Sequence, residues 1–344
     1  RNWLRCKKGK IMLDWATAKL PCRHDPSKLI SGMVMSFDPQ GNNEWVVNKK
    51  LSVEGSHSSK IQIASADTSH IWVSGNPVKF LQGHNIFGSN DLKKIMAKFF
   101  DALLQQDALG LDPHPFQYDY IQQGVYSLSR VDMNESWHLD NKNDVLAWIR
   151  AFGSTVRLKH RGAAQFSGDT AYIGKNSRRW SAKCYSKGHE ITAKGHQLPK
   201  ELQIPELLEY ADKSLRLELV MRQLELKRRG LDMAWYWHES TAKMLLQTMV
   251  LDNLELSSTF MIDDKILDTL PTRLRLVYQT WKNGDDLKQI MTKPTFYRVR
   301  KQLLAFGIDI AVVNEKNNII PLIRYLEAEP VGIPDWAYEK NLVA

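Results

Sequence analysis

One short stretch of the chain places a tyrosine between two lysines at a spacing that could do chemistry. In WSAKCYSK (180–187), which reads as a β-strand, Lys183, Tyr185 and Lys187 would project from one face. A phenol has a pKa of about 10 and is a poor nucleophile at neutral pH. Flanking ammonium groups would favour the phenolate and also hold a phosphate. The pattern therefore suits attack of a tyrosine on a phosphodiester, although an ordinary strand surface has the same spacing.

Three carboxylates could complete such a site. Glu190 follows the tyrosine, Asp132 ends the stretch SRVD (129–132), and Glu218 lies in LRLE, whose strand has to adjoin. Hard carboxylate oxygens together with a substrate phosphate are the usual ligands of Mg²⁺ or Mn²⁺. We expect these three side chains as candidate ligands, with solvated carboxylates as the alternative. The sequence has no His-x-His pair for a histidine metal site and no Walker loop for an ATPase or helicase motor.

The positive charge of the chain is concentrated in a few stretches. The sequence holds 47 Lys and Arg against 38 Asp and Glu, a net charge of +9. Residues 150–200 hold eleven basic residues against two acidic ones, residues 271–302 hold eight against two, and residues 1–11 hold five against none. A solvated face would explain one such run. Two long internal runs in an otherwise acidic chain favour binding of a polyanion.

Two further features are expected to contact that polyanion. Arg178 and Arg179 precede the tyrosine strand and are placed to clamp a phosphate backbone rather than to take part in chemistry. In KFLQGHNIFG (79–88), Gly83, His84 and Asn85 could contact phosphate from a glycine turn. A structural, hydrogen-bonded histidine is the alternative at that position.

Length and composition exclude several classes of protein. The 344 residues suggest two domains, and 43% hydrophobic with 25% charged residues are ordinary for a soluble globular protein. No apolar run approaches the roughly 20 residues that cross a membrane, and no secretory signal is visible. Cys6, Cys22 and Cys184 are too few and too scattered for a disulfide framework or a zinc site. They are expected to be reduced thiols in a cytosol.

The first two-thirds of the chain predicts strands with interspersed helices. Short β-branched and aromatic segments indicate strands in 12–82, with further strands at 124–134, 169–174, 180–187 and 215–226. Helices are predicted at 90–108, capped by Asn90, at 140–153 and at 205–213. Because strands and helices do not alternate regularly, we expect an α+β fold with a mostly antiparallel sheet and flanking helices.

A second unit is predicted after residue 235. Helices at 272–283, at DDLKQIM and at 294–306 precede a short apolar strand, IDIAVV, the turn NEKNN and IIPLIRYL. Three helices and a hairpin make a winged helix-turn-helix, with 294–306 as recognition helix. Its buried side is expected to carry Phe296, Val299, Leu303 and Phe306. Tyr297, Arg298 and Lys301 fall on its exposed side, where they would contact DNA. A plain helical cap with a solvated basic face is the alternative.

Several segments resemble the filamentous-phage gene II proteins, the rolling-circle replication initiators. The segment GNPVKFLQGHNIFGSNDL (75–92) is similar to the signature of that family. The stretches SRVD, TAYIG to SRRWSAKCYSKGHE (170–190) and LRLELVMRQLELK (215–227) agree with it, and 317–344 resembles the family's carboxyl terminus. The resemblance covers Met12 to Ala344 and is nearest to the IKe-like phages.

The resemblance implies a definite activity. The family nicks the (+) strand of supercoiled replicative-form DNA at the phage origin through a 5′-phosphotyrosine and later recircularises the displaced strand. The family's nucleophile matches Tyr185, Lys187 and Glu190 match the same motif, and Asp132 matches the SRVD strand. The implied cofactor is Mg²⁺ or Mn²⁺. The implied partners are origin DNA, first as supercoiled duplex and then as single (+) strand, the host replicative helicase and polymerase, and other copies at the origin, in the host bacterial cytoplasm and without a membrane.

The resemblance also divides the chain. Residues 1–11 have no counterpart in the family, so we treat them as a basic leader of open origin. A catalytic nicking and joining domain is expected at 12–235 and a DNA-binding domain at 236–344. Met261, in FMIDDKILD, resembles the internal start of the shorter gene X product, so a product spanning 261–344 is expected from the same frame.

One rival from another class remains open on the sequence. It is a non-catalytic origin-binding protein or transcriptional regulator that uses the winged unit. A covalent DNA adduct separates the two hypotheses, because only the enzyme forms one. If Tyr185 is not the nucleophile, Tyr172 is the next candidate.

Overall fold

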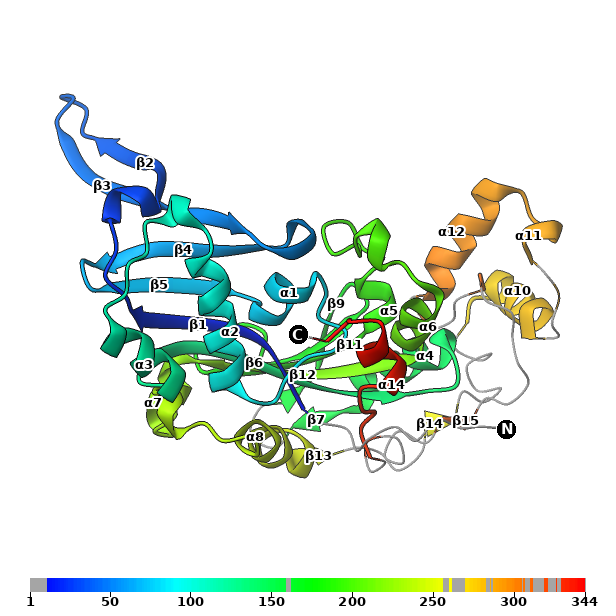
Figure 1. The fold of residues 1–344 in the computed structure, drawn as a ribbon. Helices are drawn as coiled ribbons and strands as arrows, with labels where there is room; N and C mark the ends of the chain where they lie inside the picture. Colours follow the sequence, from blue (N-terminus) through cyan, green and yellow to red (C-terminus); the bar gives the residue numbers. More distant parts are fainter. Residues whose placement is uncertain are drawn as a thin grey trace.

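A ten-stranded antiparallel sheet forms the centre of the molecule (Figure 1). The computed structural model describes residues 11–158, 162–255, 260–261, 270–282, 285, 287–304, 306, 310–311, 319–320, 326 and 329–343. The strand order is β2-β3-β4-β5-β1-β6-β12-β11-β10-β9. The strands are β1 (Met12–Pro21), β2 (Ile30–Phe37), β3 (Asn43–Glu54), β4 (Lys60–Asp67), β5 (His70–Gly75), β6 (Ser127–His138), β9 (Gln165–Ser167), β10 (Thr170–Ile173), β11 (Trp180–Ser186) and β12 (Ser214–Arg222).

Helices surround this sheet, and two short sheets complete the fold. The helices are α1 (Pro77–Gln82), α2 (Leu92–Leu104), α3 (Pro115–Gln123), α4 (Lys142–Thr155), α5 (Lys187–Glu190), α6 (Pro205–Lys213), α7 (Gln223–Arg228), α8 (Thr241–Met249), α10 (Thr272–Lys282), α11 (Leu287–Ile290), α12 (Lys293–Leu304) and α14 (Asp335–Glu339). The short strands are β7 (Arg157–Leu158), β8 (Gly162–Ala163), β13 (Leu254–Glu255), β14 (Phe260–Met261) and β15 (Ile319–Ile320).

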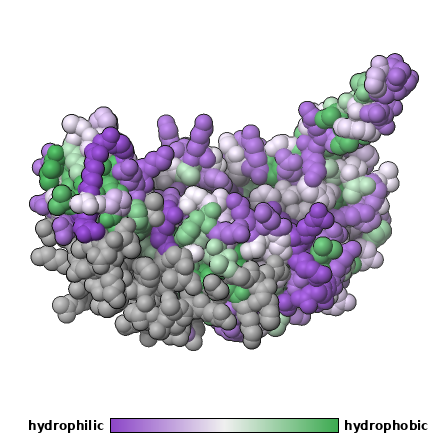
Figure 2. All heavy atoms as spheres, turned by 180° about the vertical axis from the view of Figure 1, so that it is seen from behind, coloured by the Kyte–Doolittle hydropathy of each residue, from purple (hydrophilic) through white to green (hydrophobic). Residues whose placement is uncertain are grey.

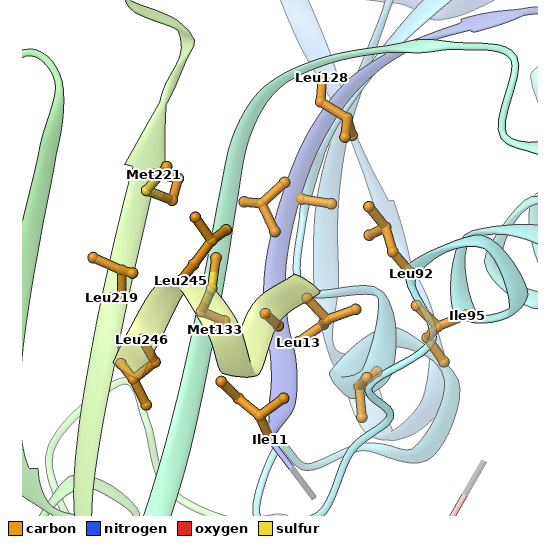
Figure 3. Packing of buried hydrophobic residues seen from close by; sticks show 14 of the residues in the cluster. Ile11, Leu13, Leu92, Ile95, Leu128, Met133, Leu219, Met221, Leu245 and Leu246 are labelled. Atoms are coloured by element: carbon orange, nitrogen blue, oxygen red, sulfur yellow. The ribbon is translucent and has the colours of Figure 1, made fainter. Parts of the chain in front are cut away.

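Apolar and polar residues alternate along the central strands, so each strand has one apolar and one polar face. In β12, Leu215, Leu217 and Leu219 point to one side while Arg216 and Glu218 point to the other, because successive strand residues face opposite ways. The apolar sides of β1, β6 and β12 pack beneath α2 and α8 in the main core (Figure 3). The polar side carries the charged residues, so any reactive site of the sheet is expected there.

A second apolar cluster lies beside that polar side. Phe87 contacts the rings of both Tyr210 on α6 and Trp336 on α14. Backbone hydrogen bonds join this carboxyl-terminal segment to the sheet, since the amide of Val331 donates to the carbonyl of Ser136 at 2.8 Å. The segment 329–343 therefore packs on the body formed by 12–235. The α8 helix packs there too, so the core has no break at residue 235, where the sequence predicts a domain boundary.

The helices α10, α11 and α12 have an apolar cluster of their own. Phe296, Val299 and Leu303 on α12 are buried in it, as the sequence predicts for the recognition helix. A wing is not among the described elements, because 312–318 and 321–325 lie outside the described residues. The described strand 319–320 pairs with 260–261, which precede the helices. Of the predicted strand IDIAVV only 310–311 are described, and they lie in a turn. Most of FMIDDKILD and residues 1–10 of the leader also lie outside the described residues.

Most predicted elements are present, with shifted ends. The cap of α2 is Asp91, whose carboxylate accepts from the amide of Lys94, and not the predicted Asn90. The strand predicted at 215–226 ends at Arg222, because 223–228 continue as a helix. Among the described helices, none is long and apolar enough to cross a membrane. Cys22 and Cys184 are buried free thiols.

Glu135 yields a test of this packing. It lies on the apolar side of β6, opposite Leu217, and its Oε1 has no hydrogen-bond partner. Burial raises the pKa of Glu135 to about 7, with the charge of Lys243 opposing. A folded pKa above the unfolded one gives stability at low pH that is lost as the pH rises through 7.

We therefore expect Glu135→Gln to gain stability relative to the unsubstituted protein as the pH increases. Between pH 5 and pH 8 the difference in free energy of unfolding should move by about 2–3 kcal/mol in favour of the variant. Urea unfolding at both pH values measures this, with the exposed Glu201→Gln as control. An equal difference at the two pH values would contradict the packing described.

Candidate active site

Three charged side chains share the polar side of the central strands. Glu218 on β12 lies directly opposite Lys183 on β11, and Asp132 on β6 lies opposite Val220, two residues from Glu218. Directly opposed residues and residues two apart point to the same side of a sheet. Asp132, Glu218 and Lys183 therefore form one row, and the strand of Glu218 adjoins that of Tyr185, as the sequence hypothesis requires.

A fourth charged residue, Asp14, was not predicted. The pairing of β1 with β6 is irregular between Leu13 and Trp15, which makes Asp14 the extra residue of a bulge. Its Oδ1 accepts hydrogen bonds from Nδ2 of Asn76 at 2.6 Å and from Nδ2 of Asn85 at 2.8 Å. The bulge thus turns this carboxylate toward the predicted acidic residues.

These carboxylates line one cavity of about 540 Å³. Asp14, Asp132, Glu190 and Glu218 all contribute to its wall. Burial raises the pKa of Glu218 to about 7, with Lys183 opposing and the carboxylates of Asp14 and Asp132 reinforcing. Burial also raises the pKa of Asp132, although Arg130 works against it. Burial and mutual repulsion therefore disfavour the ionised forms of the carboxylates in this wall.

Cations of the chain already pair with three of these carboxylates. Arg130 donates to both oxygens of Asp132, and Nζ of Lys183 lies 2.9 Å from Oε1 of Glu218. Lys187 pairs with Glu190. Burial alone would lower the pKa of Lys183, but Glu218 raises it to about 12, so this lysine stays charged.

The donors suit a divalent cation, but the predicted ligand set does not converge. Within the described residues, no three His, Cys, Asp or Glu side chains lie close enough together to hold a metal ion. Glu190 is engaged by Lys187, which lowers the pKa of the glutamate to about 2 although burial acts in the opposite direction. Asn134 lies opposite Glu218 with a buried, unpartnered Oδ1. Asp14, Asp132 and this oxygen fit hard-cation chemistry better than Glu190 does.

Tyr185 lies on the same side of the sheet but in a different state from the one predicted. Its side chain is 5% exposed, and its hydroxyl donates to Oε2 of Glu218 at 3.2 Å. Burial raises the pKa of Tyr185 well above its ordinary value, and the charges of Glu190 and Glu218 add to this. The prediction that two lysines favour the phenolate is therefore wrong for this conformation. Lys183 and Lys187 are each neutralised by a glutamate.

Lys187 begins α5 and is fully buried rather than exposed beside the tyrosine. Its Nζ donates to Oδ1 of Asn85 at 2.7 Å, so Asn85 joins this lysine to Asp14. A side chain at Gly188 would meet the backbone of Asp212 at 2.7 Å, so only glycine lets α5 approach α6 this closely. The motif KGHE thus positions a lysine as well as a glutamate.

A buried arginine holds the loop that carries Asn85. Arg216, on the polar side of β12, donates to the backbone carbonyls of Asn85 at 2.7 Å and Ile86 at 2.8 Å. Gly83, at a φ of +83°, ends α1 and starts this loop. His84 in the same loop is fully buried, and its Nδ1 accepts from the amide of Ile86. Burial and Lys187 lower the pKa of His84 to about 4, so the structural alternative fits and direct DNA contact by this side chain does not.

A smaller cavity of about 310 Å³ is lined by Tyr185 and shares Lys183 and Glu190 with the first cavity. Tyr172, which opposes Lys183, and His189 line it together with Tyr185. Nδ1 of His189 lies 3.3 Å from Asp169. Both candidate tyrosines therefore face the same space.

Basic side chains continue the row beyond the carboxylates. Arg222 on β12 lies directly opposite Arg130 on β6, two residues from Val220 and Asp132 respectively. Like charges at opposed positions destabilise a sheet unless an anion lies between them. Arg222 forms no ion pair with a described carboxylate, and one of its Nη atoms donates to Oγ of Ser181. This pair is a candidate phosphate contact.

The other predicted DNA contacts are exposed but do not gather at the cavity. Arg178 and Arg179 lie in the turn before β11, where Nη1 of Arg179 is 3.7 Å from Oε2 of Glu225. Tyr297, Arg298 and Lys301 lie on the exposed side of α12, as predicted.

Sequence reasoning missed Asp14, Arg216 and Arg222, and it expected Asn85 only as a phosphate contact from the glycine turn. Arg216 and Arg222 alternate with apolar residues in LRLELVMR, so this alternation could have pointed to them. Nothing in MLDWATAKL signals the bulge that redirects Asp14.

Comparisons with known proteins identify two family models that match the chain. A family model that describes the N-terminal part of a replication-associated protein matches residues 12–240, and a second model, for the C-terminal part of the same protein, matches 261–343. A rolling-circle replication initiator protein from Geobacillus stearothermophilus superposes with a TM-score of 0.31 at 12% identity, over 74% of this chain and 89% of its own. A TM-score that low does not establish a shared fold.

Curated relatives carry the same name as the family models. The replication-associated protein of Enterobacteria phage I2-2 is 39% identical over 94% of this chain and 95% of its own length. The proteins of that name from Salmonella phage IKe and Enterobacteria phage M13 are 25% and 23% identical, over 77% and 78% of this chain and 74% and 77% of their own. The predicted resemblance to filamentous-phage gene II proteins is confirmed, and the chain belongs to this family of phage replication-associated proteins.

Proposed function

We propose that this protein initiates rolling-circle replication by nicking the (+) strand of supercoiled phage DNA at the origin and later rejoins the displaced strand. The observation that carries the proposal is the hydrogen bond from the Tyr185 hydroxyl to Glu218, beside a cavity lined by carboxylates. A nucleophile, a proton acceptor and a hard-cation environment are the parts that tyrosine-mediated phosphoryl transfer needs.

The proposed cleavage step exchanges one ester bond for another and involves two proton transfers. The Tyr185 oxygen attacks the scissile phosphorus while its proton passes to Glu218. The bond from phosphorus to the 3′-oxygen breaks, and that oxygen takes up a proton from water, which leaves a 5′-phosphotyrosine and a 3′-hydroxyl. Because the new ester is still a phosphodiester, a 3′-hydroxyl can reverse the step without ATP. Lys183, which stays charged, stabilises the developing charge on the phosphate.

The carboxylate wall is the proposed place for Mg²⁺ or Mn²⁺. Asp14 and Asp132, which line the cavity, would hold the cation, which would polarise the scissile phosphate when bound. Asn134, two residues from Asp132 on β6 and with an unpartnered Oδ1, is a further candidate oxygen donor. Glu218, predicted as a third ligand, instead acts as the proton acceptor for the phenol it already contacts. Glu190 positions Lys187 and, through Asn85, the Asp14 carboxylate.

DNA would lie along the row of charged residues on the sheet. Successive residues of one side are about 6.6–6.8 Å apart along a strand, so the Arg130–Arg222 pair lies one such step from Asp132. We place the phosphate next to the scissile one between these arginines, where it would neutralise them. Arg178 and Arg179 continue the contact with the backbone, and Tyr297, Arg298 and Lys301 bind duplex DNA in a winged helix-turn-helix.

We extend the proposal to the setting of the reaction, which the family resemblance supports. In the cytoplasm of the bacterial host, negative supercoiling would help open a single-stranded stretch at the origin. Host helicase and polymerase would extend the released 3′-hydroxyl, and several copies would assemble at the origin. An internal start at Met261 would yield a second product from the carboxyl-terminal part.

Tyr185→Phe tests the nucleophile. Supercoiled origin DNA carrying a radiolabel, incubated with Mg²⁺ and denatured, should leave DNA covalently bound to the unsubstituted protein and to the matched control Tyr172→Phe. Tyr185→Phe should lose the adduct because it lacks the attacking oxygen. An adduct that persists in Tyr185→Phe and vanishes in Tyr172→Phe would move the nucleophile to Tyr172. Neither nick nor adduct with the unsubstituted protein would favour a non-catalytic regulator.

Asp14→Asn tests the cation site. Loss of one carboxylate should weaken Mn²⁺ binding about tenfold or more, since metal ligands are worth that much in affinity. Electron paramagnetic resonance of free Mn²⁺ measures this without any need for activity. Asp119→Asn, an exposed carboxylate on α3, is the control and should bind as the unsubstituted protein does. Unchanged Mn²⁺ affinity in Asp14→Asn would remove this residue from the site.

Arg222→Gln tests the path of the DNA. Removal of a charged hydrogen bond to phosphate should reduce cleavage of a single-stranded origin oligonucleotide about tenfold. A neutral methylphosphonate at the phosphate beside the scissile one should make the variant and the unsubstituted protein equal within about twofold, because the contact is then already lost. Lys227→Gln is the control of equal charge. A tenfold difference that survives every such neutral replacement would contradict the placement.

A further inference from the structure

A two-stranded arm leaves the body of the molecule and exposes apolar side chains on both of its sides. It consists of residues 30–50, namely β2, most of β3 and the turn between them. It forms one end of the sheet and projects beyond the body of the molecule (Figures 1 and 2). Its large apolar residues are exposed to between 40% and 58%. These residues are Met33, Val34, Met35, Phe37, Trp45, Val46 and Val47. Isolated ribbons of this kind are marginally stable in water, so the apolar surface calls for a partner.

The arm is preformed. The carboxylate of Asp38 accepts from the amides of Gln40 at 2.9 Å and Asn42 at 2.7 Å, and Gly41 takes a φ of +86° that closes the turn. β2 pairs with β3 without interruption from Gly32 to Ser36, and irregularities in register occur only at its two ends. A partner therefore meets an ordered surface and does not have to order it.

β2 is also the open edge of the ten-stranded sheet. Its other edge presents a row of backbone donors and acceptors over eight residues, about 26 Å. Such an edge is a template for another strand, and proteins that do not use one usually blunt it with charges or proline. No charged residue or proline lies within β2.

The charges on the arm favour a second copy of this chain over DNA. Residues 30–50 carry two acidic and two basic residues, with Asp38 and Glu44 at the tip and Lys49 and Lys50 at the base. An acidic tip repels a phosphate backbone. An antiparallel pair of arms would instead bring each acidic tip beside the basic base of the other copy.

We propose that two copies of this protein associate through antiparallel pairing of their β2 strands about a two-fold axis near Val34. Strands related by such an axis pair residues that point to the same side. Met33 of one copy then lies opposite Met35 of the other, and Val34 lies opposite itself. Phe37 lies opposite Ser31, so the tip covers the base. The two sheets become continuous, and the association rests on the arm alone, independently of the nicking reaction.

Met35→Lys tests the interface in the full-length protein. Sedimentation equilibrium should show a reversible dimer for the unsubstituted chain and a dissociation constant raised about tenfold or more in the variant. Leu276→Lys, which alters an exposed leucine of α10, is the matched control and should dimerise as the unsubstituted chain does. Circular dichroism, and thermal unfolding at concentrations well below the dissociation constant, should not differ between the variants, since the side chain is exposed in the monomer.

A cysteine scan tests the register. In a Cys6→Ser background, where Cys22 and Cys184 are buried, Val34→Cys should form disulfide-linked dimers under mild oxidation, and Ser31→Cys should not. Equal cross-linking at both positions would indicate random collision and overturn the pairing. A chain that stays monomeric up to about 100 µM, with or without origin DNA, would overturn it as well. Reduced DNA binding by Met35→Lys with no change in mass would assign the arm to DNA instead.

Discussion

The buried guanidinium of Arg216 is the constraint on which the candidate site depends. It projects from the polar side of β12 and binds two carbonyls of the loop after α1. That loop presents Asn85, which joins Asp14 to Lys187. A fully buried arginine has to satisfy its donors, and breaking such a network costs several kcal/mol, about 3–5. The position of the loop, and with it the ordering of both ends of the site, follows from this one side chain.

The alternation of residues in β12 gives the two sides of the sheet different roles. The leucines pack against α8 and the rest of the main core on the apolar side, and Arg216 and Glu218 lie on the polar side. Because β12 lies between β6 and β11, it brings the carboxylate of Asp132 and the strand of Tyr185 to the same surface. Burial, reinforced by the charges of Glu190 and Glu218, raises the pKa of Tyr185 and keeps the phenol protonated, while Lys183 and Lys187 are engaged by these glutamates. A phosphate entering the row would compete for those lysines.

Much of the architecture and part of the site could be predicted from the sequence. Alternation in 180–187 placed Lys183 and Tyr185 on one side, and helical spacing identified the buried residues of α12. Asp14 could not be found, because its role depends on a bulge that is set by the pairing of β1 with β6. The protonation of Tyr185 could not be found either, since it depends on Glu218 across the strand pair and on burial. Local patterns report which way a side chain points, but not what lies opposite it.

The central claim is that Tyr185 forms the covalent link to DNA, and peptide mapping tests it most directly. Trypsin separates the two candidates, because Tyr185 lies in the peptide 184–187 and Tyr172 in the peptide 162–175. After cleavage of origin DNA with Mg²⁺ and digestion of protein and DNA, mass spectrometry should find nucleotide attached to 184–187. Nucleotide on 162–175, or on any other peptide, would contradict the account.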